Sequence, residues 1–188
     1  MRQQARGSRK GARSRLTPHV PGFFCVVTRS ESQTRSWGRR LGKLLRGGEI
    51  IGLSGELGSG KTCFVRGLAE GLEVDKEAWI RSPSFTLINE YQGRRPLYHI
   101  DLYRVEGRSA LQELNLDDYL FSDGVSVAEW CEHLPAGELD EWLRVEFVHD
   151  NGNRRRLTFT AYGERYEEIL KALGNRQQAV GTKIEDGG

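Results

Sequence analysis

The sequence has few cysteines and lacks any long apolar run. Its three cysteines, Cys25, Cys63 and Cys131, are far apart and odd in number, so a disulfide framework is not expected, and their spacing matches no zinc site. No apolar stretch approaches the ~20 residues of a membrane-spanning helix. These absences predict a soluble, cytoplasmic protein without a membrane contact. Its 188 residues are enough for one α/β domain with a sizeable core.

Acidic residues are absent from positions 1–30, although the whole chain carries a net charge of only +2. The basic stretch 1–22 cannot bury a core and is predicted to be a disordered arm. Such an arm could have no specific role, contact nucleic acid, address an organelle or reflect an over-long translation start, and its composition leaves these alternatives open. A single domain is expected over 23–173, followed by a polar, disordered tail over 174–188.

A glycine-rich loop is the most informative motif in the chain. Residues 55–62 read Gly-Glu-Leu-Gly-Ser-Gly-Lys-Thr, a full match to the phosphate-binding pattern G-x-x-x-x-G-K-[ST]. Glycines allow successive N–H groups to face one anion, and the following helix adds its positive N-terminal end. We therefore predict that the loop holds the phosphates of a nucleotide. Lys61 would reach the β- and γ-phosphates, and Thr62 would ligate Mg²⁺.

Apolar periodicity and turn residues predict the remaining elements. Strands are expected at 23–28, 50–54, 85–91, 96–101, 125–129, 142–149 and 155–162, and helices at 32–45, 61–71, 110–114 and onward, and 164–173. A strand followed by a phosphate loop and a helix implies a parallel sheet, whereas the two predicted hairpins imply antiparallel neighbours. The predicted fold is therefore α/β and P-loop NTPase-like: a mixed sheet with a parallel centre, flanking antiparallel hairpins and helices on both faces.

Two acidic residues that end apolar strands are candidate partners of the loop. Asp101 ends 97–101 and Glu129 ends 125–129, and each shares a face of its strand with apolar side chains. A carboxylate in that position is costly to bury unless a cation accompanies it, and Mg²⁺ would supply the charge. The alternative is an ordinary strand-end acid, solvated or paired with Arg104. Strand position alone does not decide between these interpretations.

Other residues near the predicted site are weaker candidates. His99 is more typical of a structural histidine than of a catalytic one, and Trp130 is expected in the core. Ser82, Ser84 and Thr86 lie in a loop of the kind in which nucleotide switches sense the γ-phosphate.

Four short motifs follow one another along the chain. They are 55–62, Ser-Pro-Ser-Phe-Thr-Leu at 82–87, His-Ile-Asp-Leu-Tyr-Arg at 99–104, and Glu-Trp at 129–130. Together they resemble the TsaE (YjeE) family of small bacterial ATPases, and the resemblance covers about residues 23–162. It implies binding of ATP and Mg²⁺, and docking on the TsaB–TsaD pair. In that pair, TsaD transfers threonylcarbamoyl to adenosine 37 of ANN-decoding tRNAs, so contact with tRNA would be indirect.

The resemblance also implies roles for single residues. Lys61, Asp101 and Glu129 would serve hydrolysis, and Thr62 and Glu129 would hold Mg²⁺. Nucleotide binding would involve Glu31, Thr34, Leu57, Gly58, Ser59, Gly60, Lys61 and Thr62, with Glu31 and Thr34 in the segment near the base.

The sequence departs from the family pattern at two positions. Cys63 stands where Thr or Ser is usual, and Ser84 where Thr is usual. A thiol is a poorer donor than a hydroxyl, so nucleotide binding is expected to be weaker by about 0.5–1.5 kcal/mol.

Two other functions are compatible with the phosphate loop. A small-molecule kinase would use the same loop, but it needs an acceptor pocket and usually an Arg-rich lid, and the sequence shows no clear lid. A non-hydrolysing scaffold would bind nucleotide without turnover. The four motifs favour an ATPase that serves tRNA modification over both alternatives.

Overall fold

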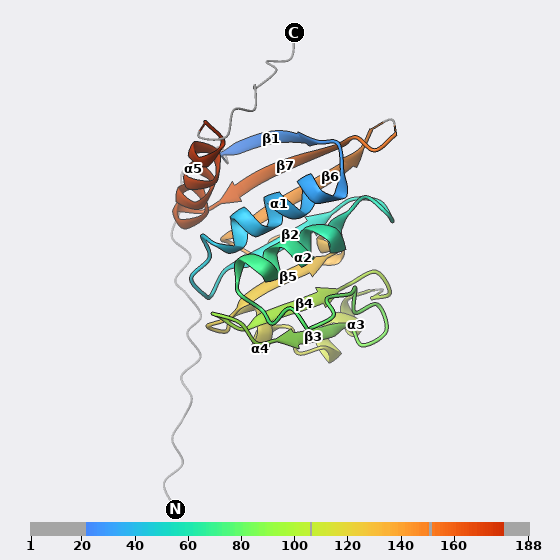
Figure 1. The fold of residues 1–188 in the computed structure, drawn as a ribbon. Coiled ribbons are helices and arrows are strands. Elements are labelled where there is room, and N and C mark those ends of the chain that lie inside the picture. Colours follow the sequence, from blue (N-terminus) through green and yellow to red (C-terminus); the bar gives the residue numbers. More distant parts are fainter. Residues whose placement is uncertain (1–21, 106, 151, 179–188) are drawn as a thin grey trace, which may run out of the picture.

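The computed structural model describes residues 22–105, 107–150 and 152–178. Positions 1–21 of the predicted arm and 179–188 of the predicted tail lie outside the described residues. Seven strands form one sheet in the order β1-β7-β6-β2-β5-β4-β3 (Figure 1). They are β1 (Phe23–Thr28), β2 (Ile50–Ser54), β3 (Ile88–Tyr91), β4 (Leu97–Asp101), β5 (Val125–Glu129), β6 (Trp142–His149) and β7 (Arg155–Tyr162).

The centre of the sheet is parallel and its edges are antiparallel. β2 pairs in parallel with both β5 and β6, and β4 pairs in parallel with β5. The two hairpins, β3–β4 and β6–β7, supply the antiparallel pairs, and β1 adds to the outside of β7. The predicted fold class is confirmed. The carboxyl ends of β2, β4 and β5 consequently lie along one edge, which is where open α/β sheets place their ligands.

Helices cover both faces of the sheet. They are α1 (Glu31–Gly42), α2 (Lys61–Gly71), α3 (Gly107–Glu113), α4 (Asp117–Leu120) and α5 (Glu164–Gln178), with a short 3₁₀ helix at Cys131–His133. The core under α1, α2 and α5 includes Leu41, Phe64 and Leu173, and the core on the other face includes Leu116 and Leu120 of the α3–α4 region. Within the described residues, no helix is long and apolar enough to cross a bilayer.

Among the helices, α1 and α2 make the closest contact, and they lie side by side over the sheet in Figure 1. Each helix contributes two glycines spaced four apart: Gly38, Gly42, Gly67 and Gly71. A Cβ atom at Gly38 would lie 2.1 Å from the Phe64 carbonyl oxygen, and one at Gly67 would lie 1.9 Å from that of Arg35. The two backbones therefore touch, and no larger residue fits at these positions.

Several element boundaries differ from the sequence prediction, four of them notably. α1 ends at Gly42 instead of 45, because Lys43 caps it and the Leu44 N–H bonds to the Leu41 carbonyl. β3 begins at Ile88 instead of 85, because Leu87 adopts a left-handed φ of 63° and closes a turn. The helix expected around 110–114 is broken after Glu113, and α5 continues to Gln178, past its expected end at 173.

Candidate functional site

The glycine-rich loop joins β2 to α2 at the carboxyl edge of the sheet. Gly55, Gly58 and Gly60 have φ values of 133°, 77° and 106°, a region that disfavours side chains. Gly60 caps α2 without a side-chain acceptor, and no acidic residue lies in the first turn of the helix. The Ser59 hydroxyl is buried and has no hydrogen-bond partner among the described residues. An unpartnered Ser59 hydroxyl and a helix N-terminus without a side-chain cap fit an anion such as phosphate.

Lys61 lies across its own loop. Its Nζ donates to the carbonyl oxygens of Gly55, at 2.5 Å, and Glu56, at 2.9 Å, and stands 3.9 Å from the centre of the Trp130 ring. Burial lowers the pKa of Lys61, and the nearby Glu129 carboxylate partly opposes this shift. The ammonium group is therefore held at the loop by neutral carbonyl and aromatic partners, which an anionic phosphate could replace with an ion pair.

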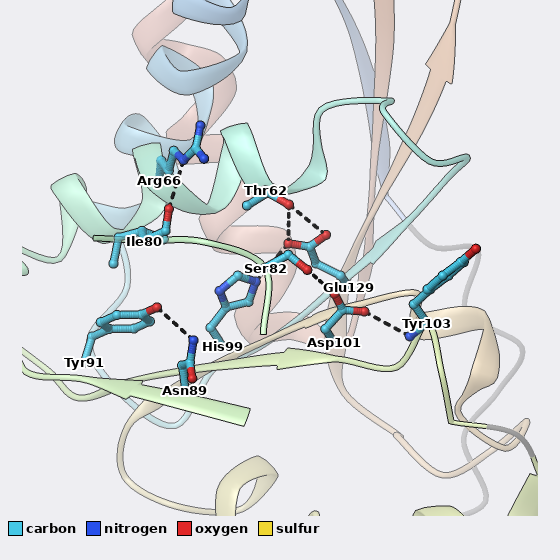
Figure 2. A network of polar contacts seen from close by, with 10 residues as sticks. All are labelled: Thr62, Arg66, Ile80, Ser82, Asn89, Tyr91, His99, Asp101, Tyr103 and Glu129. Atoms are coloured by element: carbon cyan, nitrogen blue, oxygen red, sulfur yellow. Dashed lines mark hydrogen bonds and ion pairs between the residues drawn. The ribbon is translucent and has the colours of Figure 1, made fainter. Parts of the chain in front are cut away.

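Thr62 and Glu129 meet beside the first turn of α2, as Figure 2 shows. The Thr62 hydroxyl lies 2.9 and 3.1 Å from the two carboxylate oxygens of Glu129, whose residue is only 3% exposed. A hydroxyl has one proton, and here the proton faces the carboxylate. The lone pairs of the Thr62 oxygen are therefore free for a cation. A hydroxyl oxygen next to a buried carboxylate is the hard-oxygen set that suits Mg²⁺.

Asp101 lies next to Glu129 but makes different contacts. The two residues are directly paired across β4 and β5. Asp101 accepts hydrogen bonds from the Ser82 hydroxyl and from the Tyr103 backbone N–H, at 2.9 Å for the latter (Figure 2). It is 2% exposed. Asp101 therefore sits at the site with a fixed orientation but without contact to Thr62.

A cavity of about 300 Å³ brings the predicted residues together. Its lining includes residues 57–62 of the loop, both strand-end acids, and also Ser82, Ser84, Tyr103, Arg104 and Trp130. Glu31 and Thr34 do not line it. Thr34 is fully buried and bonds to Thr28 at 2.9 Å, although its methyl group lies near Gly60, and Glu31 is exposed at the start of α1.

A larger hollow lies elsewhere on the molecule. Its volume is about 850 Å³, and it is lined by α1, α2 and residues 74–80. It contains none of the residues predicted for the site, so the smaller cavity over the loop is the candidate functional site.

Two sequence interpretations about the site need correction. Trp130 is not confined to the core: it is partly buried and packs against the core on the α3–α4 face, but it also lines the cavity and contacts Lys61. Its φ of 62° turns the chain directly after Glu129. Arg104 makes no ion pair with Asp101 among the described residues, because its guanidinium lies 4.4 Å from the ring centre of Phe85.

One supporting residue was missed altogether. Arg155, at the start of β7, is 9% exposed, and its Nε donates to the carbonyl oxygen of Ser59 at 3.1 Å. It therefore supports the phosphate loop from a strand almost a hundred positions later. No local motif marks it, and only the order of the sheet reveals the contact.

The fold and the loop together define a P-loop NTPase-like α/β protein. The model of the family described as "Threonylcarbamoyl adenosine biosynthesis protein TsaE" matches residues 28–157. The chain belongs to the TsaE family. It is 36% identical to the tRNA threonylcarbamoyladenosine biosynthesis protein TsaE of Bacillus subtilis over 78% of this chain and 90% of the relative. It is 46% identical to the Nostoc protein of the same name, over 77% and 90%.

A solved structure has the same fold. The crystal structure of Bacillus subtilis YdiB superposes with a TM-score of 0.70 at 32% sequence identity. The match covers 85% of this chain and 99% of the other. The likeness therefore extends over nearly the whole described region and is not confined to the phosphate loop.

Proposed function

We propose that this protein is a Mg²⁺-dependent ATPase of the cytoplasm that serves threonylcarbamoyladenosine formation at position 37 of ANN-decoding tRNAs, acting on the TsaB–TsaD pair. Relatives at 36–46% identity bear the name of that pathway. The observation that carries the chemistry is the contact between Thr62 and Glu129 beside a glycine loop whose helix has no side-chain cap and whose buried Ser59 hydroxyl has no partner among the described residues.

Each residue of the site has a distinct task in this proposal. The loop N–H groups of 57–62 and Lys61 bind the phosphates. Thr62 and Glu129 hold Mg²⁺, which would offset charge on the β- and γ-phosphates. Asp101 orients the attacking water. Thr62 and Glu129 already contact each other, so they would stabilise charge in the transition state with little reorganisation. Lys61 would first exchange its carbonyl contacts for the phosphates.

The base of the nucleotide is assigned to the start of α1. Glu31 is exposed there, and its backbone carbonyl accepts a bond from the Cys63 thiol at 3.3 Å. This contact connects the start of α1 to Cys63, which lies in the first turn of α2. A nucleotide held at the loop would therefore extend toward the exposed Glu31, with the buried Thr34 behind it.

The decisive experiment measures ATP hydrolysis by the purified chain, alone and with a TsaB–TsaD pair from the same source. We expect slow hydrolysis alone and faster hydrolysis with the pair. Both rates should be abolished in Lys61→Ala and Thr62→Ala and nearly abolished in Glu129→Ala. Glu132→Gln is the matched control, since Glu132 is exposed near Lys61 but makes no contact with Thr62.

The other outcomes separate the alternatives. Transfer of phosphate to a metabolite without release of free phosphate would identify a kinase. ATP-dependent binding to partners without turnover under any condition would identify a scaffold. Turnover at the wild-type rate in Glu129→Ala would contradict the metal role of that residue.

A further inference from the structure

His99 is a fully buried histidine with a single polar contact among the described residues. It lies on β4, and its Nε2 is 2.9 Å from the Oε1 atom of Glu129. The same carboxylate oxygen lies 2.9 Å from the Thr62 hydroxyl. Figure 2 shows His99 and Thr62 approaching the Glu129 carboxylate from different elements, β4 and α2. Glu129 is thus held between two donors. Thr62 belongs to the phosphate loop, whereas His99 belongs to β4.

The strand register produces this contact. On β4 and β5, His99 is paired with Val127, and Asp101 is paired with Glu129. His99 therefore reaches the carboxylate diagonally, two residues along the neighbouring strand on the same face of the sheet, a separation that a long side chain can span. A histidine at position 99 thus adds a donor for Glu129 without occupying the cavity itself, whose lining does not include it.

The second ring nitrogen fixes the tautomer. His99 Nδ1 is buried and has no hydrogen-bond partner among the described residues. A hydrogen on Nδ1 would be a buried, unpaired donor, which is costly. A hydrogen on Nε2 points to a carboxylate oxygen and is satisfied. The geometry therefore selects the tautomer that carries its hydrogen on Nε2.

We propose that His99 is a positioning residue that holds the Glu129 carboxylate in the orientation required to bind Mg²⁺ together with Thr62. This inference rests on the proposed function, because it presupposes a metal at Thr62 and Glu129. Without the imidazole donor, the carboxylate would keep only the Thr62 bond and could rotate about its side-chain torsions. Partners that orient a metal-binding carboxylate typically change metal affinity by about 10–100-fold.

The test uses three variants of the full chain. His99→Leu keeps apolar volume but removes the donor. His99→Gln places an amide nitrogen near the position of Nε2. His99→Asn carries the same amide on a shorter side chain that reaches only the position of Nδ1, so it is the matched control for His99→Gln.

Two readouts do not depend on turnover. Electron paramagnetic resonance gives the affinity for Mn²⁺ in the presence of ADP, and calorimetry in EDTA gives the metal-free affinity for ADP. We expect Mn²⁺ affinity to fall about 10–100-fold in His99→Leu and His99→Asn and to be restored in His99→Gln. Metal-free ADP affinity should be the same in all four proteins. A role in folding alone would not separate Gln from Asn in this way.

The wild-type chain provides an independent check. Nitrogen-15 NMR of metal-free protein should show the hydrogen of His99 on Nε2, and a hydrogen on Nδ1 would overturn the proposal. If the Leu variant does not fold, the Gln and Asn pair and this spectrum decide. Wild-type Mn²⁺ affinity in both His99→Leu and His99→Asn would refute the positioning role alone. A wild-type chain that binds no Mn²⁺ with nucleotide would refute the proposed function itself, and the positioning role with it.

Discussion

Asp101 and Glu129 are directly opposite each other on β4 and β5, yet their carboxylates are held by separate sets of donors. Glu129 faces α2 through Thr62, whereas Asp101 faces the loops through Ser82 and Tyr103. Two acids on adjacent parallel strands would repel each other if both were left unpaired in a buried site. The separate donors divide the tasks of the site between the two acids.

Asp101→Asn should lower the turnover number without weakening metal binding. The amide keeps the shape of the side chain but lacks the charge needed to orient water, and loss of such a group typically costs about 10²–10⁴-fold. Steady-state hydrolysis at several Mg²⁺ concentrations separates the two effects. Ser82→Ala, which removes only the hydroxyl donor, should have a smaller effect. A wild-type turnover number in Asp101→Asn would exclude this role.

Cys63→Thr should strengthen nucleotide binding. Burial raises the pKa of the Cys63 thiol, with a further contribution from Glu31, so the thiol stays protonated and donates only weakly at neutral pH. A hydroxyl at this position would gain about 0.5–1.5 kcal/mol by bonding to a phosphate, or up to about tenfold in affinity. Calorimetry with ADP measures the difference, and Cys63→Ala is the control. An unchanged affinity would mean that the new hydroxyl binds the Glu31 carbonyl instead.

Gly67→Ala should destabilise the protein strongly. Its Cβ would enter the space of the Arg35 carbonyl, so α1 and α2 would have to separate, and overpacking of this kind typically costs about 1–3 kcal/mol or more. Gly174 provides the opposite case. It lies within α5 with open space around its Cβ position, and Gly174→Ala should stabilise by about 0.5–1 kcal/mol. Urea unfolding of both variants tests the sign of each effect.

Tyr166→Phe should cost stability at neutral pH and less at high pH. The Tyr166 hydroxyl accepts the Ile50 N–H at 2.8 Å, and its removal leaves a buried donor unpaired, at about 1–3 kcal/mol. Burial raises the pKa of Tyr166 above its ordinary value of 10.0. The unfolded chain therefore loses this proton first, and the stabilisation declines as pH rises above 10.

Urea unfolding of wild type and Tyr166→Phe at several pH values measures this effect. Because both proteins share every other titrating group, their difference isolates the tyrosine. The difference should be constant below about pH 9 and should shrink above pH 10. A difference that grows above pH 10 would contradict the raised pKa.

The part of the site that the sequence predicts consists of residues that can be recognised from their immediate neighbours in the chain. The phosphate loop needs only eight consecutive residues. Asp101 and Glu129 each end an apolar strand, and the carboxyl ends of parallel strands meet at one edge. Their proximity therefore follows from the fold class. The prediction that each acid shares a strand face with apolar side chains was also correct, since Leu97, Val125 and Val127 all enter the core beneath α2.

The parts that could not be predicted depend on long-range packing. Arg155 supports Ser59 only because β7 and β1 lie beside the loop. The glycines of α1 and α2 are spaced four apart in each helix, but which helix they would contact becomes clear only where the two backbones touch. Leu87 was misplaced in a strand because its apolar side chain fits the alternation, whereas the turn at Pro83 and Leu87 places its backbone in the left-handed region.

The position of β2 in the sheet also affects the order in which the protein can assemble during synthesis. β2 ends at Ser54, but its two neighbours begin at Val125 and Trp142, and β1 pairs only with β7. A ribosome must therefore synthesise the chain through β5 and β6 before β2, the strand that leads into the phosphate loop, has a partner on both sides. The phosphate loop therefore reaches its folded conformation late in synthesis, so an incomplete chain would not have a complete nucleotide site.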